Sequence, residues 1–447
     1  MLSLIVIIFI ASLLLCALLG LPMIYAVLAG LLLFFGYGLR RGIPFARLLR
    51  VVNPGIRRSM IVIVVLLLIG IMSAAWRSSG LMALLIIKGL SIIYPPLFLL
   101  FVFLLCSGFS FIIGSSFGTA SVMGVMLFTL GSAAGVNPLL SGGAILSGIY
   151  FGDRASVLSS SAVLVASLSQ VDHKKHLGNM FRSSALPFIL SALVYAVLSR
   201  YFPYNARDAN AVYELEAFFK LDNPILLVPL VLVLLPVFTK LRLRGAILLS
   251  TLAAFGIAVL YQKIDPLLAL RDLIFGYSRP IENPQLQLLY GGGILSILKP
   301  VLIIFFSGAL PPLLTELGAL TRYQEFLERL AVKTSSFFSA MLSGVLCSAI
   351  GCSQTLAVFL QAPLLDKVYP SGHNEQKALA IGSTSILLSG LVPWNIAMVV
   401  PLAVIGAPMG SGLFAVYLYL VPLVMLVVEV ARKRRRGLGR EEDTPAV

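Results

Sequence analysis

The feature that most constrains this chain is a series of long apolar stretches. These stretches are residues 1–21, 60–76, 95–113, 187–202, 225–238, 245–261, 291–308, 335–350 and 412–431. An α-helix of about 20 apolar residues crosses the hydrocarbon core of a bilayer. Backbone polar groups in lipid must be hydrogen-bonded within the chain, which excludes open sheets. With shorter and interrupted stretches included, we expect an all-α polytopic membrane protein with about ten to twelve hydrophobic elements, some of them broken or re-entrant.

The overall composition supports a membrane protein and argues against a nucleic-acid-binding protein. Hydrophobic residues make up 59% of the 447 residues and charged residues only 11%. Soluble domains carry about 25% charged residues, so this chain lacks the composition of a water-facing surface. The net charge of +15 is concentrated in short segments that flank apolar stretches. Such basic flanks are typical of cytoplasmic loops rather than of nucleic-acid sites.

The distribution of charge predicts the orientation of the chain. Residues 39–58 contain several arginines and no acid, and the tail at 432–447 begins with the sequence RKRRR. Residues 204–223 carry more acidic than basic side chains. The positive-inside rule therefore predicts cytoplasmic amino and carboxyl termini and an outward segment at 204–223. Residues 1–20 lack a basic start and a cleavage site, so we expect a retained first span in a bacterial inner membrane.

A weak internal repeat divides the single transporter domain, residues 1–447, into halves at 59–203 and 291–431. Residues 114–119 (GSSFGT) and 351–355 (GCSQT) each follow an apolar stretch. A second pair of interruptions has the sequences LSGIYFGD at 146–153 and LSGLVPWN at 388–395. In this alignment Asp153 and Asn395 are equivalent. We expect the two halves to have inverted orientations.

Paired interruptions of this kind indicate broken helices that meet at a binding site. Discontinuous helices in corresponding halves of transporters place half-helix termini around a substrate or ion. Small residues also allow helices to pack closely, which is the alternative explanation for any single glycine. Because two matched sets contain an acid and an amide, the sequence favours the binding site.

Asp153 is the leading candidate for binding an ion, because carboxylates within apolar segments are costly and usually functional. It is a candidate sodium ligand. The neighbouring Arg154 leaves open a purely structural ion pair. Hydroxyl and amide groups near the interruptions are further candidates for binding the ion or substrate. They are Thr119, Ser156, Ser159, Ser160, Ser353, Thr355 and Asn395.

An enzyme is the less favoured class. Residues 114–118 match the Gly-x-Ser-x-Gly pattern of a nucleophile elbow, but that motif follows a strand and requires a histidine. The histidines His173, His176 and His373 lie in polar segments. We expect no enzymatic activity and no cofactor apart from sodium ions or protons as coupling ions. The expected partners are membrane lipids, these ions, a small organic substrate and a second copy of the chain.

The same motifs resemble those of the NhaC-type sodium/proton antiporter family, within the ion-transporter superfamily. Residues 147–159 (SGIYFGDRASVLS) are similar to the family's SGAYFGD-[KR]-x-SPLS block, and residues 391–395 (LVPWN) match its LVPWN block. Residues 114–124 resemble its GTSWGTxxxxG region. The similarity runs from about residue 70 to residue 407. The resemblance implies secondary active transport, most simply sodium/proton antiport by alternating access.

The chain departs from the family's pattern beside Asp153. The family's block continues with an acid and threonines, whereas Ser159 is followed here by Ser160, Ser161 and Ala162. The proline of the block is replaced by Val157. With a second carboxylate missing, proton movement would be less tightly tied to sodium. The alternative is therefore a sodium- or proton-coupled carrier of an amino acid or small organic acid.

Overall fold

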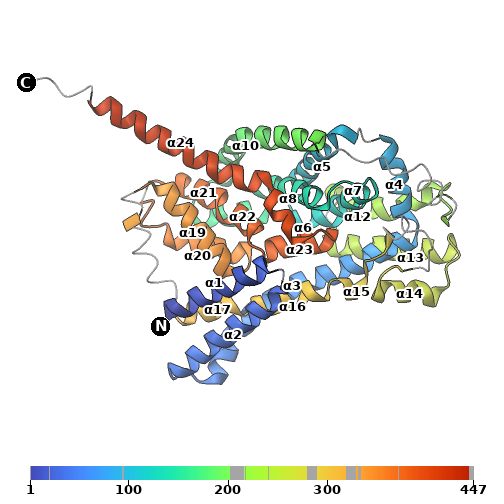
Figure 1. Ribbon diagram of the computed structural model, residues 1–447, viewed down its shortest axis with the longest axis horizontal. Helices are drawn as coiled ribbons and strands as arrows, with labels where there is room; N and C mark the ends of the chain where they lie inside the picture. The colour runs from blue at the N-terminus through green and yellow to red at the C-terminus, as the bar shows by residue number, and fades with distance from the viewer. Residues whose placement is uncertain are drawn as a thin grey trace, which may run out of the picture.

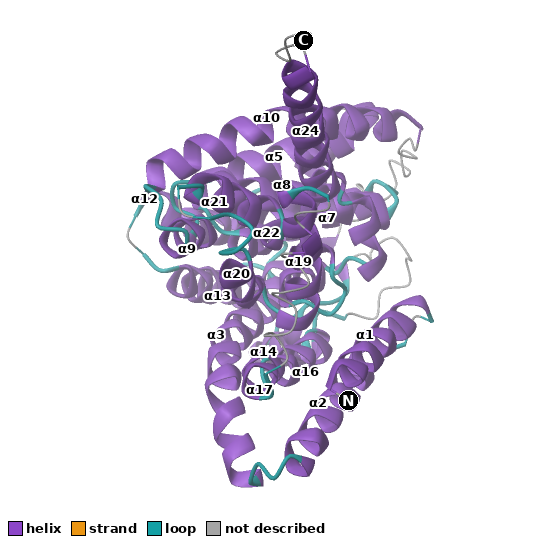
Figure 2. Ribbon diagram, turned by 90° about the vertical axis from the view of Figure 1, so that its left-hand side faces the viewer, coloured by secondary structure: helices purple, strands orange, loops and turns teal. Residues whose placement is uncertain are grey.

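The computed structural model describes residues 2–19, 21–92, 95–201, 216, 218–239, 241–278, 289–318, 329–330, 334–370 and 372–441. Within these residues all regular secondary structure is helical, apart from one isolated bridge between Tyr277 and Gly291. Figure 1 shows the helices in chain order, and Figure 2 shows the same bundle from one end. The bilayer core contains no water to bond with backbone N–H and C=O groups. Helices are therefore favoured there, because a helix forms its backbone hydrogen bonds within itself.

The amino-terminal part comprises α1 (Leu2–Leu18), α2 (Met23–Arg40), α3 (Phe45–Ser78), α4 (Leu81–Ile92), α5 (Phe98–Ile113), α6 (Ser116–Thr119), η2 (Ala120–Gly124), α7 (Val125–Ala133), α8 (Pro138–Ala155), α9 (Ser160–Leu168) and α10 (His173–Tyr201). The middle comprises α12 (Val228–Phe238), α13 (Leu243–Leu260), α14 (Pro266–Phe275), α15 (Gly293–Ser296), α16 (Leu298–Ser307) and α17 (Leu310–Glu316). The carboxyl-terminal part comprises α19 (Ser336–Gly351), α20 (Gln354–Leu364), α21 (Asn374–Ser383), α22 (Ser385–Leu388), η5 (Ser389–Leu391), α23 (Ile396–Ile405), η6 (Met409–Phe414) and α24 (Val416–Glu441).

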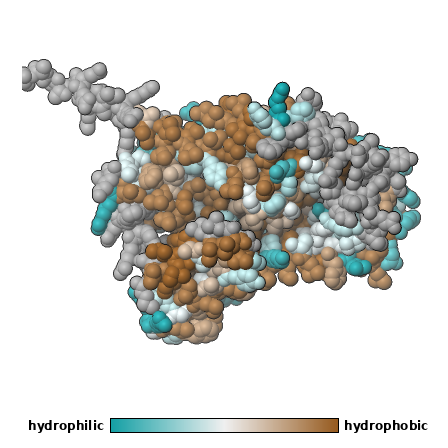
Figure 3. Space-filling view, in the orientation of Figure 1, coloured by the Kyte–Doolittle hydropathy of each residue, from teal (hydrophilic) through white to brown (hydrophobic). Residues whose placement is uncertain are grey.

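The predicted polytopic helical fold is confirmed. In the described part of the chain, six helices are long and apolar enough to cross a membrane, and a bent pair at 374–405 makes up to seven. Shorter apolar helices add further hydrophobic elements, including α5 and α19. Figure 3 shows the outcome at the surface, where hydrophobic residues cover most of the visible face and hydrophilic residues gather mainly near its edges. A water-facing protein would distribute its polar residues over this face.

Two helical hairpins have the same turn geometry. Gly114 ends α5 with φ 70°, and extended Ser115 then precedes α6. Cys352 ends α19 with φ 52°, and extended Ser353 then precedes α20. A left-handed residue followed by an extended one reverses the chain within two residues. The chain therefore reverses direction at the end of each apolar helix, and polar residues form the tip of each hairpin.

The long helix α10 shows that the two hairpins enter the molecule from opposite ends. The amide of Leu99, at the start of α5, donates to Ser199 Oγ at the carboxyl end of α10 (2.9 Å). At the other end of α10, Lys175 pairs with Glu375 of α21 at 2.5 Å. Lys377 of α21 pairs in turn with Asp366, just beyond α20. The open ends of the hairpins therefore lie at opposite ends of α10, while the inverted orientation of the two whole halves stays a prediction.

Each hairpin is followed by a helix with a break, and the positions of the breaks correct one part of the sequence alignment. The first helix, α8, ends at Ala155 and resumes as α9 at Ser160. The second ends with η5 at Leu391 and resumes as α23 at Ile396. The predicted equivalence of Asp153 and Asn395 is therefore wrong. Asp153 lies inside a helix, whereas Asn395 caps the start of the next one, so their backbone positions differ.

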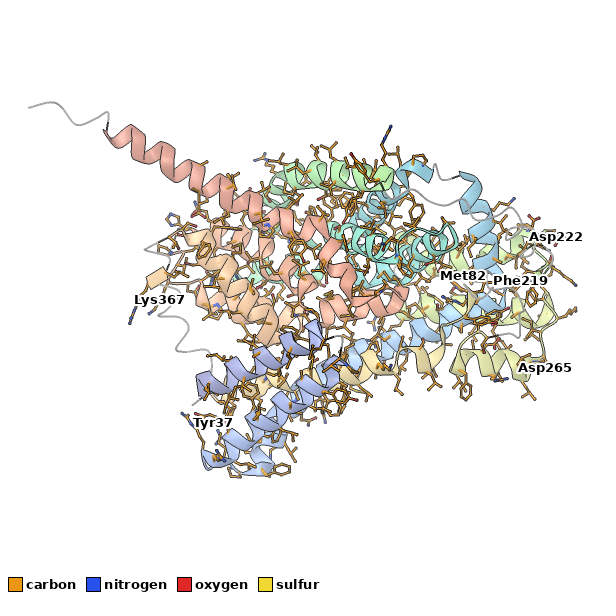
Figure 4. The ribbon with its side chains drawn as sticks, in the orientation of Figure 1. Tyr37, Met82, Phe219, Asp222, Asp265 and Lys367 are labelled. Atoms are coloured by element: carbon orange, nitrogen blue, oxygen red, sulfur yellow. The ribbon has the colours of Figure 1, made fainter. Side chains whose placement is uncertain are left out.

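The α2–α3 turn and the carboxyl-terminal end of α24, which belong to the two basic segments, both lie toward the left in Figure 1, and Figure 2 places them at the bottom and the top of the molecule, respectively. Figure 4 labels Tyr37 and Lys367 at the left, and Phe219, Asp222 and Asp265 at the right. Residues 204–215, 217 and 442–447, which belong to the predicted outward segment and tail, lie outside the described residues.

Candidate functional site

Asp153 lies in the last turn of α8 and is 4% exposed. Its Oδ2 accepts a hydrogen bond from Gln354 Nε2 at 2.7 Å. The Ser161 hydroxyl lies 3.3 Å from Oδ2 and 3.5 Å from Oδ1. Ser116 contributes its backbone N–H and its hydroxyl to the same carboxylate. The carboxylate therefore contacts residues from three separate elements.

These neighbours stand at the beginnings of helices for a local reason. Ser116 is the first residue of α6 and Gln354 is the first of α20. Amide groups in the first turn of a helix have no partner within the helix, and the helix dipole there favours negative charge. Because the hairpins enter from opposite ends, their tips bring these two helix starts to a single carboxylate.

Gln354 and Ser161 link the carboxylate to further oxygen atoms. Gln354 Nε2 also donates to the carbonyl of Ile386 (3.2 Å). Ser161 Oγ lies 3.3 Å from Gln354 Oε1. A hydroxyl has one hydrogen, so it donates to only one of the carboxylate and amide oxygens around it. Clustered carboxylate, amide and hydroxyl oxygens are the ligand types that hard cations prefer. The arrangement can therefore bind a small cation or, in its absence, a proton on Asp153.

Three of the predicted hydroxyl ligands instead bind backbone atoms. Ser156 Oγ accepts from the amide of Leu158 at 3.2 Å. Ser159 caps α9 by accepting from Ala162, and its hydroxyl donates to the backbone carbonyl of Asp153. Thr119 donates to the carbonyl of Ser115 at 2.9 Å. These residues shape the two turns that surround the carboxylate.

The other predicted hydroxyls lie at the edge of the site. Ser353 is half-buried and occupies the cap position of α20, next to Gln354, without a side-chain capping bond. Ser160 and Thr355 are exposed. Ser160 precedes Ser161 and Thr355 follows Gln354, and both Ser161 and Gln354 contact Asp153. Their roles as ligands stay predictions.

Asn395 is fully buried and its amide is occupied by backbone groups. Its Oδ1 accepts from the amide of Ala397 (2.9 Å), and its Nδ2 donates to the carbonyl of Ser348 (2.7 Å). The preceding Trp394 donates to the carbonyl of Ala349 at 2.7 Å. Both carbonyls belong to the last turn of α19, where helical partners run out. Asn395 therefore joins α19 to α23 rather than facing Asp153.

Arg154 points away from Asp153, so the alternative of an ion pair between these neighbours is wrong. Its guanidinium is fully buried and donates only to neutral oxygens in the described part of the chain. The acceptors are the carbonyls of Met180 and Gly382 and the hydroxyls of Ser183, Ser184, Ser383 and Tyr417. Charge-assisted bonds of this kind satisfy a guanidinium without a carboxylate. Arg154 thus joins α8 to α10 and α21.

Sequence reasoning missed Gln354 and Ser116 as neighbours of the carboxylate, whereas Ser161 belongs to the run of serines expected to offer hydroxyl ligands. One signal was present, because Ser116 and Gln354 hold the same position in the two tips, two residues after Gly114 and Cys352 respectively. The sequence alignment paired Gly114 with Gly351 instead of with Cys352. This shifted the two tips by one residue relative to each other, so Ser116 was not paired with Gln354.

Comparison with known proteins gives the family. Residues 148–428 match the sequence family described as the Na+/H+ antiporter family. Among similar proteins is the malate-2H(+)/Na(+)-lactate antiporter of Bacillus subtilis, 28% identical over 88% of this chain and 85% of that protein. The Na(+)/H(+) antiporter NhaC of Bacillus subtilis is 24% identical over 88% of each chain. The arginine/ornithine antiporter ArcD of Halobacterium salinarum is 25% identical over 82% of this chain and 77% of its own length.

The matched region extends from the residues just before Asp153 to α24 and so includes both helix breaks. It covers more than half of the chain, and the resemblance found in the sequence motifs is confirmed. On the match over residues 148–428, this chain belongs to the Na+/H+ antiporter family.

Proposed function

We propose that this protein exchanges Na+ for H+ across the membrane, with Asp153 binding the two ions in turn. The observation that carries the proposal is the buried carboxylate between two hairpin tips that enter from opposite ends. Hydroxyl and amide oxygens of Ser161 and Gln354 surround it. The described residues around Asp153 contribute no second carboxylate.

The missing second carboxylate leads us to expect looser coupling of protons to sodium, but a single carboxylate is in principle sufficient to couple the two ions. An ionised carboxylate removed from water requires a compensating charge or strong hydrogen bonds. A proton supplies this by forming the neutral acid, and a sodium ion supplies it by direct coordination. Because both ions need the same carboxylate oxygens, binding of one displaces the other. Exchange follows when the loaded site is exposed alternately to the two sides.

The hairpins supply the elements for alternating access. Inverted halves in transporters often move against each other around a fixed site. Here Asp153 is held by α8 and contacts the tips of both hairpins through Ser116 and Gln354. Separation of one tip from the carboxylate would open a path toward one side of the membrane.

One carboxylate also predicts a stoichiometry. If Asp153 is the only group that titrates during the cycle, one proton moves for each sodium ion and the exchange is electroneutral. Orientation follows the charge distribution: the two basic segments, at residues 39–58 and 432–447, would be cytoplasmic, with both termini on that side of a bacterial plasma membrane.

Proteoliposomes test the proposal directly. A sodium gradient is imposed on purified protein, and the internal pH is followed with a trapped fluorescent dye. We expect proton movement with sodium alone and no change in its rate when valinomycin and potassium clamp the membrane potential. A rate that depends on the clamped potential would contradict the electroneutral cycle.

The second candidate is coupled transport of an amino acid or small organic acid. Two of the similar proteins carry names that include malate and lactate, or arginine and ornithine. The same proteoliposomes distinguish the candidates when labelled solutes of each class are added. A pH response that requires one of these solutes would replace plain Na+/H+ exchange with this carrier function.

A further inference from the structure

A cavity of about 420 Å³ lies between α10, α21 and α24, away from the Asp153 cluster. One wall carries Asn179 and Arg182 of α10, and Gln376 of α21 faces the same space. The remaining wall is apolar and comes mainly from Val424 and Val428 of α24. The cavity therefore combines a polar, basic part with a strip of aliphatic surface.

Arg182 gives this cavity a positive charge. Its side chain is exposed, and it forms no ion pair with any described residue. The acid of the cavity, Glu375, is already compensated by Lys175 at 2.5 Å and accepts from Asn179 Nδ2 at 3.4 Å. The remaining amide of Gln376 is a neutral donor. The polar part thus suits an anion with several acceptor oxygens.

The apolar wall continues onto surface that a membrane would cover. Leu186 lines the cavity and is 52% exposed, and Val427 and Val430 of α24 are also exposed. One turn beyond Val428, α24 enters residues 432–436 with the sequence RKRRR. The cavity is therefore placed where an aliphatic surface meets a basic segment.

We propose that this cavity binds the headgroup of an anionic phospholipid. The phosphate lies against Arg182 and the amides of Asn179 and Gln376, and an acyl chain follows the exposed aliphatic face of α24. Basic pockets between membrane helices at the cytoplasmic side bind acidic headgroups for the same electrostatic reason. A free anion would make no use of the apolar wall, which is why a lipid fits better than phosphate alone.

The bound lipid joins the helices that surround Arg154. Ser183 lines the cavity and also accepts a hydrogen bond from Arg154 Nη2 at 2.8 Å. A headgroup bound here would hold α10, α21 and α24 together near Arg154, the residue that follows Asp153 in the sequence. Its occupancy should therefore raise the thermal stability of the protein whichever ion is transported.

Thermal unfolding of the purified, delipidated protein provides the test. Mixed micelles containing phosphatidylglycerol or phosphatidylcholine are compared, with inorganic phosphate as a third condition. We expect phosphatidylglycerol to raise Tm more than phosphatidylcholine does, and phosphate to have no effect. For Arg182→Gln, loss of one basic contact near the membrane surface should weaken phosphatidylglycerol binding about fivefold, measured by lipid titration.

Arg200→Gln is the matched control, because Arg200 is an exposed arginine at the opposite end of α10. It should keep the full response to phosphatidylglycerol. Equal effects of the two lipids, or an undiminished response in Arg182→Gln, would overturn the proposal. A rise in Tm with phosphate alone would show a soluble-anion site instead. If Arg182→Gln does not fold, Arg182→Lys keeps the charge and should retain the preference for phosphatidylglycerol.

Discussion

The two broken helices have similar backbones and different chemistry. In the first, α8 ends near Asp153 and α9 begins after Ser159. In the second, η5 contains Ser389 and α23 begins after Asn395. Asp153 lies two residues before the end of α8, and Ser389 lies two residues before the end of η5, so these two residues are equivalent. Ser159 and Asn395 are also equivalent, because each caps the helix that follows the break. A carboxylate in one half therefore corresponds to a hydroxyl in the other.

The difference teaches that symmetry of the backbone does not require symmetry of charge. Ser389 Oγ donates to Ser348 Oγ (3.0 Å), a neutral contact within its own half. Asp153 reaches across to Gln354 in the other half. Placing an acid in both halves would bring two like charges into the interior, which is costly. One half thus supplies the charge, and the other supplies neutral ligands and a rigid cap.

Asp153→Asn should produce the largest effect on transport. The amide fills nearly the same volume but cannot carry the negative charge that a buried sodium ion needs, which costs about 3 kcal/mol or about a hundredfold in ion affinity. Sodium-driven pH change in proteoliposomes measures this loss. Because Arg154 does not pair with Asp153, Tm should stay close to that of the parent protein. Parent-like sodium dependence in a stable Asp153→Asn variant would remove Asp153 from the mechanism.

Asn395→Ala should affect stability more than ion binding. Removal of its amide leaves the carbonyl of Ser348 and the amide of Ala397 without partners, at a cost of about 1–3 kcal/mol. Thermal or denaturant unfolding in detergent measures the change, and the sodium affinity of the folded fraction should be retained. The opposite pattern, unchanged stability with lost sodium dependence, would indicate that the second half also binds the ion.

Gln354→Ala should weaken sodium binding without abolishing exchange. It removes the 2.7 Å hydrogen bond to Asp153 and one amide oxygen, worth about 1.5 kcal/mol or about tenfold in affinity. The sodium concentration at half-maximal exchange measures the shift. Thr355→Ala, at the exposed neighbouring position, tests the predicted ligand role of Thr355 separately, and parent-like sodium dependence would remove Thr355 from the site. An equal loss in both variants would assign the effect to the start of α20 as a whole.

Ser389→Ala should have the smallest effect. It removes a neutral hydroxyl pair with Ser348, which contributes about 0.5–1 kcal/mol to stability. We expect the half-maximal sodium concentration to change by no more than about twofold, since 0.4 kcal/mol corresponds to about that factor. A tenfold shift would mean that the position equivalent to Asp153 takes part in ion binding, and the comparison of the two halves would need revision.

Much of the fold could be predicted from the sequence, because helices in a membrane depend on local composition. The apolar stretches correctly predicted that α3, α10 and α13 contain long apolar helices. Glycine and serine at 114–116 predicted an interruption where the first hairpin tip lies, because glycine readily adopts a positive φ. The second tip was aligned one residue out, because Cys352 rather than Gly351 has the left-handed backbone.

The surroundings of Asp153 could be predicted only in part. Its neighbours in sequence, Ser156 and Ser159, were sensible candidates, yet their hydroxyls bond to backbone groups of the turn. Adjacent residues on a helix point in different directions, which is why Arg154 faces α10 and α21 instead of its neighbour.

The sequence by itself determined that this chain is a helical membrane protein with paired helix breaks and an acid beside one of them. These properties follow from hydrophobicity and backbone preferences acting over a few residues. Only the tertiary structure decided which groups meet that acid. Gln354 lies 201 positions from Asp153 along the chain, and their contact depends on how two opposed hairpins pack. Packing over such a separation combines the shapes of many side chains, so no local pattern specifies it.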